Sequence, residues 1–282
     1  MNTKTVSSIV VLLGLAATAN AADLELKLRS RISKPEGSEK FEEIISAENW
    51  DPHKTAVVIC DMWDRHWCKA AEVRVAEMAP RMNEVVSKLR DQGMLIIHCP
   101  GETMSFYADN PARKAAQAAP HAEPMKRREP VIAEGPFPID ASDGGCSDDI
   151  SGPERRVWTR EIAALEIKPI DGISDNGDEV YNFMRQKGVE NVIMMGVHTN
   201  MCVLNRPYAI KAFVKKGLRV ALMRDLTDTM YNPKKSPFVD HFSGTDLVIE
   251  FIEKYWCPTL TSDQVIGGEP FRFAADTRTG PR

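Results

Sequence analysis

The sequence predicts an α/β protein: a three-layer α/β/α sandwich around a mainly parallel, Rossmann-like sheet. Three observations lead to this prediction. Short apolar runs rich in β-branched residues alternate with segments of helical periodicity, the links between them are short, and reactive polar residues directly follow the apolar runs. Because parallel sheets bind ligands beyond the carboxyl ends of their strands, we expect the functional residues at that edge.

The first half of the chain predicts two strands around one long helix. The run 55–62 is short and β-branched, which is typical of a buried parallel strand. Apolar residues recur at helical spacing over 71–92, and Gly93 indicates the helix end. The run 94–99 predicts the second strand. Residues 100–160 hold many prolines and read as a surface insertion with a short helix near 109–119.

The second half continues the alternation. We expect strands over 162–168, 191–196 and 218–225. We expect a helix over 175–187 that is capped by Ser174 or Asp175, a helix over 202–216 that ends at Gly217, and a helix over 239–255.

The amino terminus has the form of a secretory signal over residues 1–21. Lys4 precedes an apolar run, and Ala19-Asn20-Ala21 is a typical cleavage site. We therefore expect a periplasmic or secreted protein with no membrane segment after signal removal; an uncleaved anchor is the alternative. Residues 22–50 then form an N-terminal arm, and 51–282 form one domain.

Composition excludes some partners. The net charge of −4 is spread over a mixed surface, which argues against nucleic acid and anionic membranes and favours a small-molecule substrate. The six cysteines show no disulfide or zinc-finger spacing, and the sequence names no partner for Cys146.

Three residues stand where reactive side chains are expected. Cys202 opens a helix after a strand, a position that favours a thiolate. Asp61 follows the first strand and is a candidate base, and Lys168 ends the third predicted strand as a candidate cation. The alternatives are a core cysteine, a helix-capping or ion-paired aspartate, and a solvated lysine.

Together, these motifs resemble the isochorismatase-like cysteine hydrolase superfamily, which includes nicotinamidases, ureidoacrylate amidohydrolases and isochorismatases. The resemblance spans roughly residues 50–255 and is carried by "AVVICDM" (56–62), "KPIDG" (168–172) and "GVHTNMCV" (196–203). It implies a Cys202–Asp61–Lys168 triad within a hydrolase domain. It also implies a cis peptide between Val197 and His198, with an oxyanion hole formed by the amides of His198 and Cys202.

Together with the predicted signal, the resemblance implies an exported hydrolase that cleaves a small amide or ureide C–N bond through a thioester, and a homo-oligomer. Two alternatives stay open. One is a catalytically silent member that binds a small molecule, and the other is a vinyl-ether hydrolase of the isochorismatase type, whose chemistry needs no thiol.

The sequence departs from the family pattern around two of these residues. The family's Q-N-D-F type segment is replaced by "DMWDRHWC" (61–68), so we expect the substrate pocket to be lined by Trp63, His66, Trp67 and Thr199. A tryptophan packed under the neighbouring helix is the alternative. After Lys168 the usual aromatic and "SAF" residues are missing, which leaves the substrate class and the role of the lysine open.

No cofactor is predicted, although nicotinamidases in this superfamily bind a divalent metal beside the triad. The candidate metal ligands here are Asp64, His66 and His98. Histidines at the surface or held by hydrogen bonds are the alternative.

Overall fold

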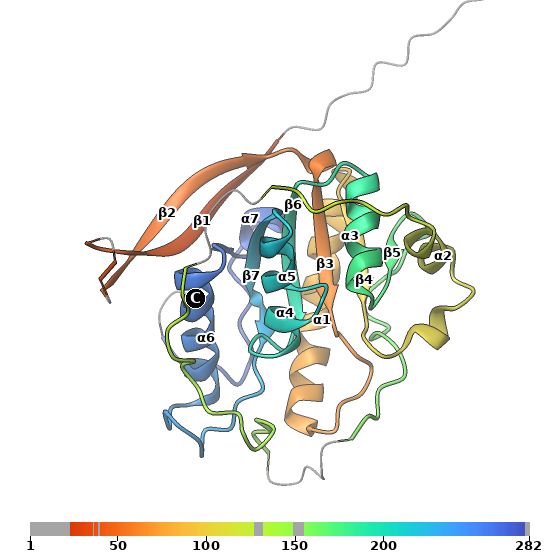
Figure 1. Cartoon of the computed structure of the whole chain (residues 1–282). Helices are drawn as coiled ribbons and strands as arrows, with labels where there is room; N and C mark the ends of the chain where they lie inside the picture. Colours follow the sequence, from red (N-terminus) through yellow and green to blue (C-terminus); the bar gives the residue numbers. More distant parts are fainter. Residues whose placement is uncertain (1–22, 36, 39, 127–131, 149–154, 280–282) are drawn as a thin grey trace, which may run out of the picture.

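The computed structural model describes residues 23–35, 37–38, 40–126, 132–148 and 155–279. These residues form an eight-stranded sheet with strand order β2-β1-β8-β7-β6-β3-β4-β5, covered by helices on both faces (Figure 1). The predicted three-layer α/β/α fold is confirmed.

Six strands of the sheet are parallel. They are β3 (Thr55–Cys60), β4 (Leu95–Cys99), β5 (Gly172–Ile173), β6 (Asn191–Val197), β7 (Arg219–Asp228) and β8 (Thr259–Leu260). From β3 the chain winds outward through β4 to β5, and it then returns to β6 and winds the other way through β7 to β8. The carboxyl ends of β3 and β6 therefore flank the topological switch point, where sheets of this kind bind ligands.

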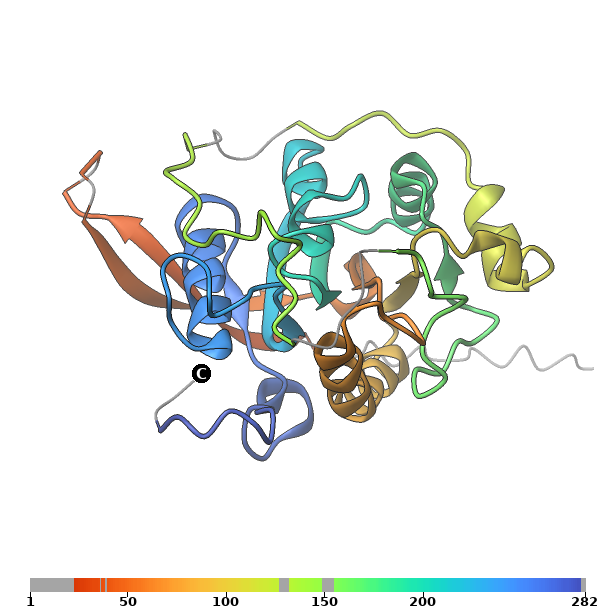
Figure 2. The same cartoon turned by 90° about the horizontal axis from the view of Figure 1, so that it is seen from below.

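Helices cover the two faces of the sheet (Figure 2). Each face has its own apolar core. On one face, α1 (Lys69–Asp91) and α7 (Asp263–Ile266) pack on the sheet. On the other lie α3 (Gly177–Gln186), α4 (Cys202–Asn205), α5 (Ile210–Lys215) and α6 (His241–Tyr255). The helix α2 (Pro111–Gln117) and two short 3₁₀ helices, Pro52–Lys54 and Met104–Tyr107, lie in the connections.

The N-terminal arm is a β-hairpin. Strand β1 (Leu24–Ser33) pairs antiparallel with β2 (Phe41–Trp50) over ten residues, and Arg29 in β1 pairs with Thr259 in β8. Leu24, Leu26 and Leu28 alternate with exposed residues and extend one core. The predicted signal lies outside the described residues. No helix within them is both long and apolar enough to cross a membrane.

Most predicted elements are confirmed, but the strand over 162–168 is wrong. This segment is a loop in which Leu165 is buried against the α1 side of the sheet and donates to the carbonyl of Ile162. Its apolar residues therefore reflect packing of a loop, and the strand beside β4 is the short β5 that follows.

The predicted helix over 202–216 is interrupted. Helix α4 ends at Asn205, and α5 begins at Ile210. Pro207 lies in the gap, and proline has no backbone N–H to continue a helix. Further upstream, α3 begins two residues later than expected. Its cap is Asn176 instead of Ser174 or Asp175, because the side chain of Asn176 accepts hydrogen bonds from the amides of Asp178 and Glu179.

Candidate active site

Three adjacent strands end at the same place. Cys60 at the end of β3 is in register with Cys99 of β4 and with Gly196 of β6. Asp61 follows β3 directly, and the turn to Cys202 follows β6. The sheet topology therefore brings Asp61 and Cys202 to the switch point from positions 141 residues apart.

Asp61 is completely buried in a network of hydrogen bonds. Its Oδ1 accepts from the amide of Gly101 at 2.7 Å and from the hydroxyl of Tyr208 at 3.3 Å, and its Oδ2 accepts from Nε of Arg206 at 3.3 Å. A Cβ atom on residue 101 would lie 2.7 Å from Oδ1 of Asp61, so this close approach requires glycine. The carboxylate is thus held in one orientation.

Cys202 is the first residue of α4; its thiol is free, and the residue as a whole is partly exposed. The thiol lies close enough to the carboxylate of Asp61 and the guanidinium of Arg206 for both groups to act on its pKa. The structure therefore brings together two of the three predicted catalytic residues and adds an arginine.

The charges at this site determine where the proton rests. Burial raises the pKa of Asp61 to about 6, although the positive charge of Arg206 opposes the shift. Burial and the neighbouring Asp61 raise the pKa of the Cys202 thiol far above its ordinary range. The thiol pKa is not lowered by the start of α4, contrary to our expectation, because burial beside a carboxylate outweighs the dipole of a four-residue helix. At neutral pH the site therefore holds a thiol, a carboxylate and a guanidinium.

Lys168 is not brought to this site. Its ammonium group pairs with Glu166, its side chain is 43% exposed, and its amide donates to Asp171. Lys168 precedes β5 instead of following a strand, so it does not lie at the carboxyl edge. Arg206 is the cation that contacts Asp61. Pro207 was the feature of the sequence that could have indicated Arg206, because this proline ends α4 and turns the chain at Arg206.

The turn between β6 and Cys202 contains the expected cis peptide between Val197 and His198. Gly196 before it has a φ of +111°, and a Cβ atom there would lie 2.1 Å from the carbonyl oxygen of Cys60. Only glycine therefore allows β6 to approach β3 this closely.

Strand β7 and the segment after it hold this turn in place. The hydroxyl of Thr227 donates to the carbonyl of Gly196 at 2.7 Å, and the amide of Thr199 donates to the carbonyl of Asp228 at 2.8 Å. The side-chain amide of Asn200 bonds both the amide and the carbonyl of Met230, each at 2.9 Å. The backbone before Cys202 is therefore fixed on one side.

Behind the turn lies a buried ion cluster that the sequence did not reveal. The carboxylate of Asp228 accepts from Nε of Arg74 at 2.7 Å and lies 2.8 Å from Nε2 of His241. Burial alone would raise the pKa of Asp228, but Arg74 and His241 hold it well below its usual range. This cluster joins α1, β7 and α6 next to the turn.

Aromatic rings gather next to the turn. The rings of Trp63 and Trp158 stack with centroids 4.2 Å apart, and the ring of His66 lies 5.9 Å from Trp158, 5.5 Å from Trp67 and 5.0 Å from His198. Three of the four predicted pocket residues therefore meet. Trp158, from the surface insertion, was not foreseen.

Thr199, the fourth predicted pocket residue, does not join these rings. Its side chain is buried, and its hydroxyl bonds the hydroxyl of Thr227 at 2.7 Å. It fixes the turn.

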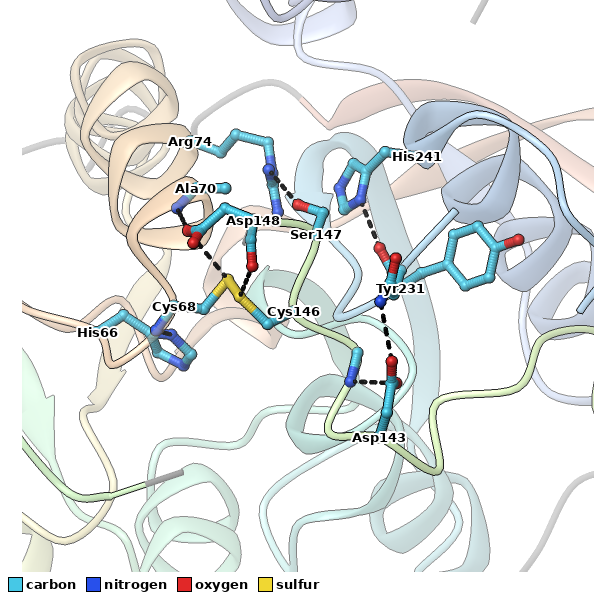
Figure 3. Close-up of a disulfide and its surroundings, with 12 residues drawn as sticks. His66, Cys68, Ala70, Arg74, Asp143, Cys146, Ser147, Asp148, Tyr231 and His241 are labelled. Carbon is cyan, nitrogen blue, oxygen red and sulfur yellow. Dashed lines mark hydrogen bonds between the residues drawn. A yellow bond between two sulfur atoms is a disulfide. The ribbon is translucent and has the colours of Figure 1, made fainter. Parts of the chain in front are cut away.

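A disulfide joins Cys68 to Cys146 beside His66 (Figure 3). The amide of Cys68 donates to Nδ1 of His66 at 3.1 Å, and the amide of Ala70 donates to Asp148 at 2.7 Å. The bridge therefore ties the segment around Cys146 to the start of α1, next to the aromatic rings.

The candidate metal ligands do not form a set. Asp64 accepts hydrogen bonds from Thr159 and Arg160, and His66 accepts from Cys68. His98 lies 2.7 Å from Glu161 and 3.3 Å from Asp171. The described residues contain one close group of ligand atoms, those of Cys68, Cys146 and Asp148, and its two sulfurs form the disulfide.

The sequence matches no protein-family model and no curated protein. The fold is similar to that of several solved structures. A cysteine hydrolase from Pseudomonas syringae pv. phaseolicola 1448A is 16% identical, with 76% of this chain and 92% of that chain covered and a TM-score of 0.48.

An isochorismatase family protein from Burkholderia thailandensis is 13% identical, with 76% and 94% covered and a TM-score of 0.44. An isochorismatase from Pseudomonas putida KT2440 is 11% identical, with 76% and 91% covered and a TM-score of 0.46. At such low identity, the chemistry has to be inferred from the residues of the site.

Proposed function

We propose that this chain is a cysteine hydrolase of the isochorismatase-like superfamily and cleaves the C–N bond of a small amide or ureide. The observation that carries the proposal is the contact of the Cys202 thiol with Asp61 and Arg206 at the switch point. A nucleophilic thiol needs a base within hydrogen-bonding reach, and Asp61 supplies one.

The reaction starts from a neutral thiol and an ionised carboxylate. Asp61 takes the proton of Cys202, and the resulting thiolate attacks the carbonyl carbon of the substrate. A C–S bond forms while the carbonyl electron pair moves onto oxygen. Asp61 is ionised at neutral pH because its pKa is about 6, and the guanidinium of Arg206 stabilises the negative charge that the carboxylate and the thiolate share.

The backbone amides of His198 and Cys202 are the candidates for binding the oxyanion. In the turn, the amides of Thr199, Met201 and Val203 donate to backbone carbonyls. The backbone hydrogen bonds of the described loops and turns do not include the amides of His198 and Cys202 as donors. Fixed amides aimed at a developing negative charge are worth about two to three orders of magnitude in rate.

The intermediate collapses when its C–N bond breaks and the leaving nitrogen takes the proton from Asp61. The acyl group remains on Cys202 as a thioester. Asp61 then takes a proton from water, the resulting hydroxide attacks the thioester carbon, and the C–S bond breaks. The thiolate recovers the proton, and the acid product leaves.

The direct test is ammonia release from a panel of small amides and ureides. We expect the wild type to release ammonia from at least one compound and the Cys202→Ala variant to release none. The Cys257→Ala variant is the matched control, since Cys257 is a free, buried cysteine after α6. Absence of ammonia release from every compound, or equal activity in Cys202→Ala, would overturn the proposal. The second result would show that the ammonia release does not depend on this thiol.

A second candidate function is binding of a small molecule without turnover. It is favoured by one observation: Lys168, the cation that the family resemblance implies, is paired with Glu166 away from the thiol. Saturable binding of an amide to the wild type with no ammonia release over hours would support this function.

Export and assembly are further proposals. We propose that the signal over residues 1–21 directs the chain to the periplasm or the exterior and that the mature chain forms a homo-oligomer. Cell fractionation and light scattering of the mature protein test these two proposals separately.

A further inference from the structure

Resting on the proposed function, we infer that the Cys68–Cys146 disulfide positions the turn that carries the nucleophile. The bridge holds residues 140–148, called here the bridged segment, against the residues that support Cys202. The reactivity of Cys202 therefore depends on the oxidised state of a disulfide that takes no part in the reaction itself.

A small apolar cluster connects the disulfide to the nucleophile. It consists of the buried residues Cys68, Ala71 and Met230, with Trp67, Ala70, Cys146 and Met201 packed against them. Met201 is the cap residue of α4 and directly precedes Cys202. Because buried side chains are close-packed, a displacement of either sulfur changes the contacts of the residue that precedes the nucleophile.

The bridged segment also supports the turn through the backbone of Met230. Gly145 has a φ of +72°, and a Cβ atom there would lie 2.2 Å from the carbonyl oxygen of Met230, so this close approach requires glycine. The side-chain amide of Asn200 bonds the amide and the carbonyl of Met230, each at 2.9 Å. Met230 therefore lies between the bridged segment and a residue that is only two positions before Cys202.

Hydrogen bonds supplement the covalent tie of the bridged segment to α1. Asp148 accepts from the amide of Ala70 at 2.7 Å, and the hydroxyl of Ser147 accepts from Nη1 of Arg74 at 3.4 Å (Figure 3). When the segment moves away, water can replace these hydrogen bonds, but nothing replaces a covalent bond. The disulfide, which joins residues 78 positions apart, is therefore the contact whose loss releases the segment.

Reduction of the bridge follows a defined course. Cys146 is partly exposed, whereas Cys68 is buried, so a thiolate of a dithiol reductant attacks the sulfur of Cys146. The S–S bond breaks, and the sulfur of Cys68 leaves and takes a proton. The second thiol of the reductant then displaces the sulfur of Cys146, which also takes a proton. The protein gains two electrons, and the reductant becomes a disulfide.

The redox compartment then sets the reactivity of Cys202. Disulfides persist outside the cytosol and are rare within it, where thiols are kept reduced. Together with the export proposed above, the bridge would make Cys202 fully reactive only after the chain leaves the cytosol.

The test measures the rate at which iodoacetamide labels Cys202 in the folded protein, read by peptide mass spectrometry. The wild type is compared before and after reduction by dithiothreitol, which is removed by gel filtration before labelling. Labelling of Cys68 and Cys146 then reports how much of the bridge is open. The double variant Cys68→Ser/Cys146→Ser lacks the bridge and shows any effect of dithiothreitol that does not depend on it.

We expect reduction to lower the labelling rate of Cys202 about tenfold, because the thiol loses its alignment with Asp61. The double serine variant should show the same low rate with or without dithiothreitol. The buried free cysteines Cys60, Cys99 and Cys257 should stay unlabelled. A mere loss of stability would have the opposite sign, because transient unfolding would raise the labelling of all these cysteines together.

Two further variants separate the packing contact from the bridge. Met201→Ala keeps the disulfide but removes the side chain that packs on its cluster, so it should lower the labelling rate of Cys202 about threefold or more. The matched control is Met125→Ala, because Met125 is also partly buried but packs against one of the two main cores. This control should leave the rate unchanged.

Activity on the amide found by the screen gives a second readout. Reduction should lower kcat about tenfold and leave KM nearly unchanged, because the change affects the reacting sulfur and not the binding of the substrate. Reoxidation of the bridge should restore kcat.

The inference is overturned if Cys202 keeps its labelling rate in protein whose Cys68 and Cys146 are open, or if the buried free cysteines become labelled in parallel with it. If the double serine variant fails to fold, as judged by circular dichroism, the reduced wild type and Met201→Ala decide. If the wild type resists dithiothreitol, the double variant and Met201→Ala decide.

Failure of this inference can be told apart from failure of the proposed function, because labelling needs no substrate. The expected fall in labelling without ammonia release from any compound would refute the proposed function and leave the positioning role of the bridge standing. Ammonia release with a kcat that reduction does not change would refute the positioning role alone.

Discussion

Strand β4 and its neighbours hold two buried charged clusters that differ in how well their charges are balanced. His98 lies between Glu161 and Asp171, and Asp171 also binds Arg90 at 2.9 Å. Asp61, in contrast, shares one guanidinium with a neutral thiol, and the Arg206 side chain is 30% exposed.

Both clusters raise the pKa of their central group, but this has opposite effects on charge, because one group is a histidine and the other is an aspartate. Burial would lower the pKa of His98, but Glu161 and Asp171 raise it to about 9, which favours the charged form. Burial raises the pKa of Asp61 to about 6, which disfavours the charged form. A cluster that stabilises its charges holds the fold together, whereas a cluster that leaves one charge poorly stabilised is where a proton can move.

The largest expected effect is a loss of catalytic activity, which should follow from a change in the Asp61 cluster. Cys202→Ala should lower kcat/KM on the amide found by the screen by about a thousandfold or more, because it removes the nucleophile. Its free energy of unfolding should change by about 1 kcal/mol or less, since the side chain is partly exposed. Steady-state kinetics and urea unfolding check both values. A large loss of stability with retained activity would reverse the comparison.

The next largest effect is a loss of stability, which should follow from a change in the His98 cluster. His98→Leu should lower the free energy of unfolding by about 3–5 kcal/mol, because it leaves two buried carboxylates without their shared partner. The control is His121→Leu, since His121 is exposed and pairs with an exposed Glu123. Equal unfolding midpoints for the two variants would show that the His98 cluster is not structural.

The pH dependence of stability gives an independent check on the same cluster. The folded-state pKa of His98 is raised from 6.5 to about 9, so its contribution is fully present below about pH 6.5 and is lost as the pH rises through 9. This shift corresponds to roughly 3 kcal/mol. Urea unfolding between pH 6 and 10 should show the loss in the wild type and a smaller one in His98→Leu.

A smaller effect tests the arginine. Arg206→Ala should lower kcat/KM by about a hundredfold, and Arg206→Lys should recover part of the loss. Because the charge of Arg206 lowers the pKa of Asp61, its removal should also move the acid limb of the pH–rate profile above about pH 6. A merely structural role would leave that limb in place.

The smallest effect is expected for Lys168, which was predicted from the sequence as the catalytic cation. Lys168→Ala should change kcat/KM by less than about twofold, because the lysine pairs with Glu166 at the surface. A hundredfold loss would mean that Lys168 reaches the thiol during turnover.

The fold was largely predictable, because alternating apolar runs and helical periodicity over residues 55–99 and 175–255 specify parallel strands and crossovers. Asp61 and Cys202 could be predicted for the same reason, since Asp61 directly follows a buried strand and Cys202 follows another after a short turn. The cis peptide before His198 was predicted from the family resemblance instead.

The remaining errors have local causes. Residues 162–168 have the apolar content of a strand, but they pack as a loop, so their last residue is not at the sheet edge. Arg206 was missed because the break at Pro207 was read as continuous helix. Trp158 and the Cys68–Cys146 bridge depend on tertiary contacts of a long insertion, which periodicity does not report.

The most direct test of the central claim is the pH dependence of iodoacetamide labelling at Cys202, measured by peptide mass spectrometry. The free cysteines Cys60, Cys99 and Cys257 are buried and serve as internal controls. We expect selective labelling of Cys202 that rises through about pH 6, because ionised Asp61 takes the proton of the neutral thiol as the sulfur attacks the reagent, and this rise should be lost in Asp61→Asn. Labelling of Cys202 that begins only above about pH 9, or that is unchanged in Asp61→Asn, would contradict a reactive unit built from Cys202 and Asp61.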